Sequence, residues 1–450
     1  MRRLASIVLV AALPAAGCTL GPDYVRPQTP QHPAYHRDSP PGSSIADLPW
    51  WEIFSDPTLD ELIRTALDNN RNLRTSLARI EEARARLGFV RADLYPSIVY
   101  GANASYSDAT QGDRSTSAAT FADVSYIVDL WGRVRRSNEA ALRDLLATEE
   151  AYGVITITLV ADVARSYFQL RGIDKRLDIS ERTVETRQRS LDIVQTRYDA
   201  GMVSEVDVHQ ARIQLTGAQA TVETFKRLRA QTENAISLFL GRPPMSIPRG
   251  LPIDDQVFPP EVPAGLPSEL VERRPDIRQA EQLLAAQTAS IGVAEAARFP
   301  SLNLSANLAA SVTNGLEAGF VSLGLDLFGP LYQAGKNKRR VEIEVARTEQ
   351  LLAQYEQSIL AAFREVEDAM VAVETYRAEH EILLTQVASA RAALDLSWAR
   401  YEEGVTSFLE VLEIERSLFT SRLRTIDAQE SRYTSIVQLY RALGGGWDNR

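Results

Sequence analysis

The side chains that most often perform enzymatic chemistry are few in this sequence, and they form no recognisable constellation. The four histidines are His32, His36, His209 and His380, and their spacing matches no metal-ligand motif such as H-E-x-x-H. Neither a phosphate-binding glycine loop nor a dinucleotide-binding glycine motif occurs in the 450 residues. A secreted hydrolase needs an activated nucleophile or a metal cluster. We therefore expect no enzyme, no metal site and no cofactor.

One stretch places two opposite charges at helical spacing. In FLEVLEIERSLF (408–419), Leu409, Glu413 and Arg416 stand at positions i, i+4 and i+7, which puts them on one face of a helix. Taken alone, Glu413 and Arg416 predict a solvated salt bridge worth on the order of a few tenths of a kcal/mol.

The only cysteine, Cys18, stands directly behind a short apolar segment at the N-terminus. Residues 1–17 begin with MRR, continue through LASIVLVAAL and end in small residues, which is typical of a signal peptide. Small residues followed by Cys resemble the bacterial lipoprotein signal, so we expect Cys18 to be lipidated, with palmitate. Ala15 departs from that signal, which usually has a large aliphatic residue there. The alternative is an ordinary signal-peptidase cut that leaves a free thiol.

The charge argues against one class of partner, and the hydropathy argues against one class of membrane segment. The formal charge of −10 disfavours nucleic acid, which binds basic surfaces. After the signal peptide no run of 18 apolar residues occurs, so we expect no membrane-spanning helix. If the chain crosses a membrane, it must do so as a closed β-barrel.

Long helices and an internal repeat organise the chain. No proline occurs between Pro96 and Pro243 or after Pro330, and 67 continuous helical residues would extend about 100 Å. RYDAGMVSEVDV (197–208) matches RYEEGVTSFLEV (400–411), which predicts two tandem halves. The expected order is an extended segment at 18–58, a first repeat at 59–240, a proline-rich connector at 241–267, a second repeat at 268–443 and a tail at 444–450.

Each half carries two segments in which apolar and polar residues alternate, as in β-strands. We expect strands at about 97–107, 119–131, 301–311 and 320–328. In SLNLSANLAAS (301–311), for example, Leu302, Leu304 and Leu308 oppose Asn303 and Ser305. Both a half-buried soluble sheet and an outer-membrane strand alternate in this way. Four strands are too few to close a barrel, since the smallest barrels have about 8 strands. Two chains would supply 8 strands and three chains would supply 12. The strand count alone does not decide between a dimer and a trimer.

Two glycines mark the points where long helices reverse direction. Gly201 and Gly404 occupy equivalent places in the repeat, and glycine adopts the left-handed conformation of a turn at low cost. Ser204 and Ser407 follow three residues later, where each returning helix needs an N-cap. We therefore expect helix–turn–helix tips near 199–206 and 402–409.

Motifs distributed from residue 18 to the end resemble the TolC-like outer-membrane efflux family, and its lipoprotein branch (NodT and OprM type) in particular. They are LGPDYVRP (20–27), PWWEIFSDPTLDELI (49–63), RRPDIRQAE (273–281), RFPSLNLSA (298–306) and LYRALGGGW (439–447).

The resemblance implies a mainly α-helical homotrimer in which each chain gives four strands to one 12-stranded β-barrel. Long helices would form a hollow periplasmic α-barrel, with a mixed equatorial domain around it. The protein would be the passive, lipid-anchored exit duct of a tripartite pump in the outer membrane. It would meet a periplasmic adaptor protein and an inner-membrane pump, expected to be a proton-driven RND transporter. The alternative is a periplasmic coiled-coil adaptor or scaffold lipoprotein without a pore.

The same resemblance assigns roles to two groups of residues. Leu409, Glu413 and Arg416 would narrow the closed pore, although Glu413 stands where the OprM-type relatives usually have Asp. The adaptor would contact the tips, at Gly201, Val203, Ser204, Val206, Gly404, Ser407 and Leu409.

Overall fold

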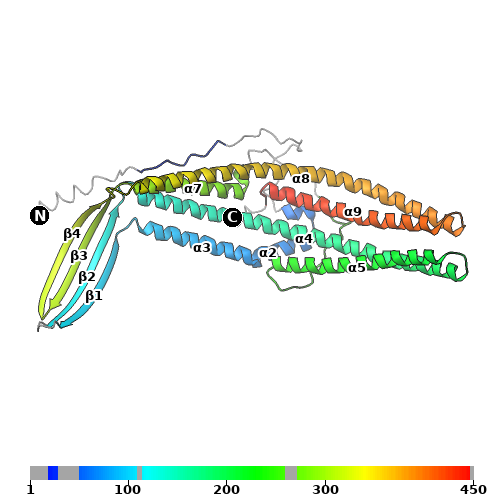
Figure 1. The fold of residues 1–450 in the computed structure, drawn as a ribbon, viewed down its shortest axis with the longest axis horizontal. Coiled ribbons are helices and arrows are strands. Elements are labelled where there is room, and N and C mark those ends of the chain that lie inside the picture. Colours follow the sequence, from blue (N-terminus) through cyan, green and yellow to red (C-terminus); the bar gives the residue numbers. More distant parts are fainter. Residues whose placement is uncertain (1–18, 29–49, 109–113, 259–270, 446–450) are drawn as a thin grey trace. The chain divides into compact units, whose positions relative to one another are not determined.

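Three pairs of helices with equal lengths give the chain its two halves (Figure 1). The computed structural model of the chain describes residues 19–28, 50–108, 114–258 and 271–445. The pairs are α3 (Arg71–Ala92) and α7 (Pro275–Ala296) with 22 residues each, α4 (Arg133–Asp199) and α8 (Lys336–Glu402) with 67, and α5 (Glu205–Phe239) and α9 (Phe408–Ala442) with 35. These matching lengths confirm the predicted internal repeat. Among the described helices, none is apolar over a stretch long enough to span a bilayer.

The described residues form two compact units. The first unit contains 19–28, 77–108, 114–151 and 276–358, and the second contains 50–76, 152–258, 271–275 and 359–445. All four strands lie in the first unit, and both helix–turn–helix tips lie in the second.

The segment expected to be extended up to residue 58 is helical at its end, so that prediction was wrong there. A 3₁₀-helix, η1, spans Trp50–Phe54, and α2 begins at Pro57 and ends at Asn69. Phe54 is fully buried against the ring of Phe168, with 4.8 Å between centroids. Burial of this aromatic surface stabilises the early helical turn, and Asp56 caps α2 by accepting a hydrogen bond from the Thr58 amide at 2.9 Å.

Four antiparallel strands form one sheet in the order β1-β2-β3-β4. They are β1 (Ser97–Asp108), β2 (Arg114–Val128), β3 (Ser301–Thr313) and β4 (Leu316–Phe328). β4 begins earlier than the expected residue 320, because Asn314 and Gly315 both have positive φ (51° and 83°) and form a tight hairpin.

β2 also differs from its expected bounds of 119–131. It begins at Arg114 because this polar end pairs with β1, Arg114 lying opposite Asp108. It ends at Val128 because the Asp129 carboxylate accepts hydrogen bonds from the backbone amides of Val134 (3.1 Å) and Arg135 (2.9 Å). Asp129 thus caps the first turn of α4 rather than continuing the strand.

The register sorts polar and apolar side chains onto opposite faces of the sheet. On one face Asp123 lies opposite Asn307 and Ser125 lies opposite Ser305. On the other face Leu304 lies opposite Leu325, and Leu323, one pair along, is 83% exposed. The apolar face is therefore exposed within a single chain.

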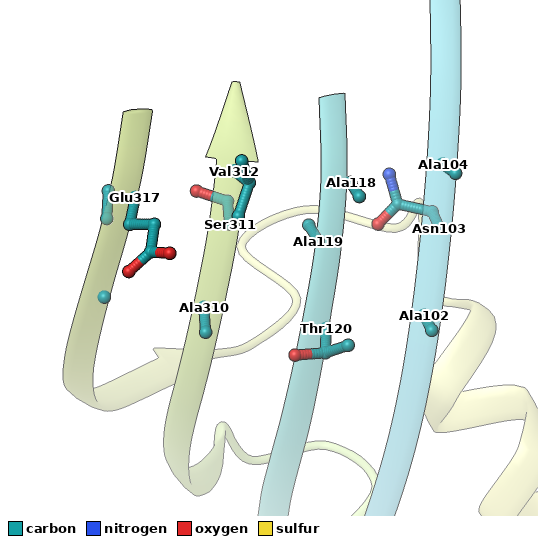
Figure 2. A pocket seen from close by; sticks show the side chains of 12 residues that line it. Ala102, Asn103, Ala104, Ala118, Ala119, Thr120, Ala310, Ser311, Val312 and Glu317 are labelled. Atoms are coloured by element: carbon teal, nitrogen blue, oxygen red, sulfur yellow. The ribbon is translucent and has the colours of Figure 1, made fainter. Parts of the chain in front are cut away.

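Small side chains leave a hollow on this sheet, drawn in Figure 2. Its lining comes from all four strands, with Ala102 on β1, Ala119 on β2 and Ala310 on β3, while Glu317 on β4 supplies its charged side chain.

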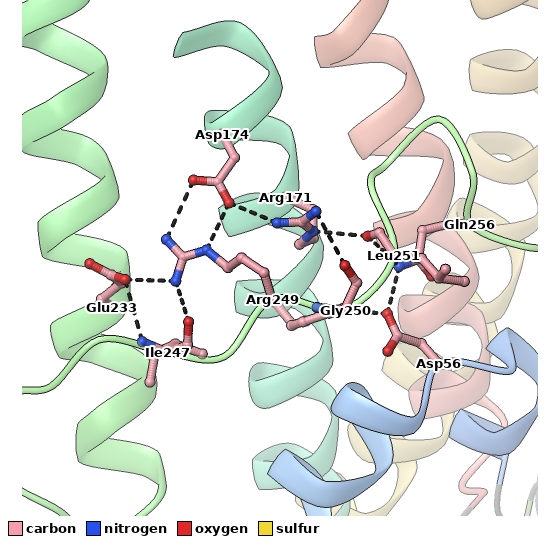
Figure 3. A network of polar contacts seen from close by, with 10 residues as sticks. Asp56, Arg171, Asp174, Glu233, Ile247, Arg249, Gly250, Leu251 and Gln256 are labelled. Atoms are coloured by element: carbon pink, nitrogen blue, oxygen red, sulfur yellow. Dashed lines mark hydrogen bonds and ion pairs between the residues drawn. The ribbon is translucent and has the colours of Figure 1, made fainter. Parts of the chain in front are cut away.

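Within the second unit, a network of charged and polar side chains holds the proline-rich connector (Figure 3). Arg249 bridges Asp174 at 2.9 Å and Glu233 at 2.7 Å. Gln256 donates to the fully buried Asp56 carboxylate at 2.6 Å. The described part of the connector, 241–258, is therefore held in place, while the remainder up to 267 falls outside the described residues.

Candidate functional site

The two tips have the same backbone geometry. In the first, the amide of Gly201 donates to the Tyr198 carbonyl at 2.8 Å and that of Met202 donates to the Arg197 carbonyl at 2.9 Å. The second tip repeats both bonds, from Gly404 and Val405, at 3.1 and 2.9 Å. Both glycines have φ of 73°, and this pair of bonds is the Schellman motif that ends a helix.

Ser204 and Ser407 occupy the N-cap positions of α5 and α9, but they do so differently. At Ser204 the backbone amide and the hydroxyl both donate to the Asp207 carboxylate, at 3.1 and 3.0 Å. Ser407 makes no side-chain capping bond. At that tip the Thr406 hydroxyl donates to Glu410 instead, and Arg400 pairs with Glu410 at 3.2 Å.

Beneath the tips an apolar cluster packs between α4, α5, α8 and α9. It contains Val194, Val208, Ala211, Tyr401, Phe408, Val411 and Leu412. Val203, one of the expected contact residues, packs partly buried against this cluster. Its main role in a single chain is therefore to support the turn.

The exposed apolar surface of the tips comes from four side chains, of which the sequence analysis identified two. Val206 and Leu409 are 60% and 58% exposed, as a contact surface requires. Met202 and Val405 are 74% and 64% exposed and were missed. Each directly follows the turn glycine, and that position at the apex is the signal that could have found them.

The residues expected to form a gate lie on the exposed face of α9. The Arg416 guanidinium donates to the Glu413 carboxylate at 2.5 Å, and both side chains are about three-fifths exposed (60% and 62%). Such a surface pair contributes at most about 1 kcal/mol. Within one chain it is a solvated ion pair beside Leu409.

Two buried charges near the tips escaped the sequence analysis. Glu415 and Arg187 are 7% and 5% exposed, and burial raises the pKa of the Glu415 carboxyl and lowers that of the Arg187 guanidinium. Glu415 falls in the helical stripe of Val411, Leu412 and Leu418. A charged residue at a core position of that stripe was the available signal.

Cys18 lies outside the described residues, but the segment that follows it is firmly held. Arg136 donates to the Leu20 and Gly21 carbonyls at 3.1 and 3.2 Å and to the Asp23 carboxylate at 2.6 Å. Arg26 pairs with Glu281 at 2.9 Å. The described segment that begins at residue 19 is thus held at the β2–α4 junction, where the Leu20 amide donates to the Trp131 carbonyl at 3.2 Å.

Comparisons with known proteins agree over nearly the whole chain. Residues 62–242 and 266–445 match the family described as "Outer membrane efflux protein". The chain is 35% identical to the toluene efflux pump outer membrane protein TtgC of Pseudomonas putida, over 97% of this chain and 94% of that protein. It is 36% identical to outer membrane protein OprJ of Pseudomonas aeruginosa, over 98% and 95% of the two chains.

A solved structure shows the same fold. The open state of the Neisseria gonorrhoeae MtrE outer membrane channel superposes with a TM-score of 0.86 at 31% identity, covering 96% of this chain and 99% of that one.

Proposed function

The chain belongs to the outer membrane efflux protein family, and on that premise we propose that three copies of it enclose one continuous exit duct. The protein is an outer-membrane component of an efflux pump, and its family consists of transport ducts rather than enzymes. In the proposed assembly each chain supplies four strands to a 12-stranded barrel and its long helices to a hollow periplasmic extension.

The sorted faces of the sheet carry this proposal. A half-buried soluble sheet would cover its apolar face, yet Leu323 and Tyr100 are 83% and 89% exposed. Outside lipid such a face is unfavourable, whereas in a bilayer it is the required surface, with the polar face toward water. The edge strands β1 and β4 carry unpaired backbone groups, which are costly in lipid. Pairing β1 of one copy with β4 of the next removes both edges.

We place the adaptor at the tips, on the apolar surface of Met202, Val206, Val405 and Leu409, with Val203, Ser204 and Ser407 around the turn glycines. Beyond the adaptor we expect an inner-membrane pump of the proton-driven RND type. At each tip two large apolar side chains are exposed near the turn glycine, and clustered exposed apolar side chains favour docking.

Val206→Glu is expected to weaken adaptor binding by about tenfold or more, because it buries a charge in an apolar contact. His209→Glu, one turn along the same helix and also exposed, is the control and should bind like wild type. Surface plasmon resonance with the purified periplasmic adaptor would measure both. Equal affinity of wild type and Val206→Glu would rule out the tip surface.

We propose that Leu409, Glu413 and Arg416 form the periplasmic constriction of the closed duct. Three copies of Glu413 around an axis repel one another, and the 2.5 Å bond from Arg416 relieves that repulsion within each chain. The acidic ring would also favour cations over anions in the closed state.

The double variant Glu413→Ala with Arg416→Ala is therefore expected to raise the single-channel conductance of the purified trimer several-fold and to reduce its cation preference. Planar-bilayer recordings measure both quantities. The control is Glu185→Ala with Arg189→Ala, an exposed ion pair on α4 with 3.8 Å between the charged atoms, which should leave selectivity unchanged. If conductance and selectivity of the Glu413 and Arg416 double variant equal those of wild type, these residues do not line the constriction.

We further propose that Cys18 carries the lipid that anchors the N-terminus to the outer membrane, with most of the chain in the periplasm. One acyl chain binds membranes only marginally, so several are needed for a stable anchor. Because the strands already hold the trimer in the bilayer, Cys18→Ser should lose the lipid mass in intact-protein mass spectrometry and still assemble. Failure of Cys18→Ser to form any trimer would contradict this division of roles.

A further inference from the structure

A small cavity lies among α4, α8 and α9, next to the buried charges Arg187 and Glu415. Its volume is about 180 Å³, enough for a few water molecules at about 30 Å³ each. Four cationic and two acidic residues line it: Arg182, Arg187, Arg391, Arg422, Asp395 and Glu415. The lining is therefore positively charged overall.

Arg187 is buried, and among the described residues no carboxylate lies within ion-pair distance of it. One of its terminal nitrogens donates to the Gln214 carbonyl at 2.6 Å, and its guanidinium carbon lies 5.0 Å from the centre of the Phe419 ring. Among the described residues its Nε finds no acceptor and no acid forms an ion pair with it. Burial lowers the pKa of Arg187, and the attraction to Glu415 offsets that shift only in part, which reflects the cost of burying the charge.

The other two arginines increase this excess. Burial lowers the pKa of Arg422, and repulsion from the charge of Arg391 lowers it further. Neither has an ion pair within the described part of the chain, whereas Arg182 is paired with Asp178 at 2.9 Å. Three arginines without ion pairs among the described residues thus line one cavity against two acids, the exposed Asp395 and the buried Glu415, so the cationic residues outnumber the acidic ones.

Glu415 offsets this charge only in part, by its attraction to Arg187. Its Oε1 accepts from the Ser190 hydroxyl at 3.2 Å, and within the described residues Oε2 has no hydrogen-bond partner. Burial raises the pKa of Glu415, so the carboxyl resists ionisation where it lies. A water molecule would satisfy hydrogen bonds here but leave the net charge in place.

We propose that the cavity binds a small inorganic anion, of chloride to phosphate size, held by Arg187, Arg391 and Arg422. Guanidinium groups suit this role because they stay charged and present several N–H donors in a plane. The bound anion connects α4 to α8 and α9, and so stabilises the packing of these three helices. This inference concerns the chain's own packing and does not depend on what the duct transports.

Two measurements on the purified full-length protein test this proposal. In crystals grown with bromide in place of chloride, an anomalous peak should appear between Arg187 and Arg422. In solution, the melting temperature should rise with chloride or inorganic phosphate at constant ionic strength, with gluconate as the replacing anion, because a ligand that binds only the native state stabilises it. The anion that raises the melting temperature more, chloride or phosphate, identifies the class of anion that the cavity prefers.

Variants make the result specific. Arg391→Gln and Arg422→Gln should weaken anion binding at least about tenfold, since each removes a charge-assisted contact. Glu415→Gln should strengthen it, because a residual negative charge is lost. Arg182→Gln, whose arginine is already paired, should bind like wild type. The absence of an anomalous peak together with an anion-independent melting temperature in wild type would overturn the site, and would do so without bearing on the duct.

Discussion

Leu323→Arg is expected to abolish most recovery of membrane-inserted trimer. Leu323 lies near the middle of β4 on the apolar face, where its side chain is 83% exposed. Arginine on a lipid-facing strand costs about 2–4 kcal/mol near the bilayer midplane, and three copies incur the cost in one assembly. The amount of unheated trimer in outer-membrane fractions on SDS gels measures the effect.

Ser322→Arg is the matched control, since Ser322 is the preceding residue and lies on the opposite face, across from Asn307. There an arginine would meet water in the duct, so assembly should remain near the wild-type level. Equal loss in both variants would show that position along the strand, rather than the face, decides insertion.

The second large effect is expected from Asp56→Ala, which should lower the free energy of unfolding by at least about 3 kcal/mol. Asp56 is fully buried, caps α2 through the Thr58 amide at 2.9 Å and accepts from Gln256 at 2.6 Å and from the Tyr167 hydroxyl. Loss of a cap costs about 0.5–2 kcal/mol, and each buried donor left unsatisfied costs about 1–3 kcal/mol.

The Asp56→Asn variant keeps the shape of the side chain and changes only its hydrogen-bonding groups. The amide oxygen can still cap α2, so the loss should be about 1–2 kcal/mol, less than for alanine. Burial and the bond to Asp56 raise the pKa of Tyr167, so its hydroxyl stays a donor at neutral pH in both variants. Circular dichroism melts of the detergent-solubilised protein measure the difference, and an alanine variant as stable as wild type would contradict the role of Asp56.

The regular parts of this fold could be predicted from the sequence because they depend on local periodicity. The absence of proline from 97–242 allowed α4 and α5, and alternation located all four strands. The ends of strands depend on single contacts instead. Asp129 ended β2 by capping α4, and Asn314–Gly315 extended the β3–β4 hairpin, neither of which changes the alternation of hydropathy.

The candidate site was predictable to the extent that it follows from turn chemistry. Gly201 and Gly404 identified both tips, because only a few residues adopt positive φ readily. The grouping of Arg187, Glu415 and Arg422 around a cavity could not be foreseen, since it depends on how separate helices pack. A constriction made by three copies of Glu413 would appear within one chain only as an exposed helix face.

Single-cysteine labelling of β4 tests the central claim most directly, namely that the sheet separates lipid from the water of a duct. Cysteines are placed one at a time at Val321, Ser322, Leu323, Leu325 and Asp326 in a chain whose native Cys18 is serine. A charged, membrane-impermeant maleimide should label the assembled trimer at 322 and 326 and leave 321, 323 and 325 unmodified. Uniform labelling at all five positions, or labelling on the leucine face alone, would contradict the account.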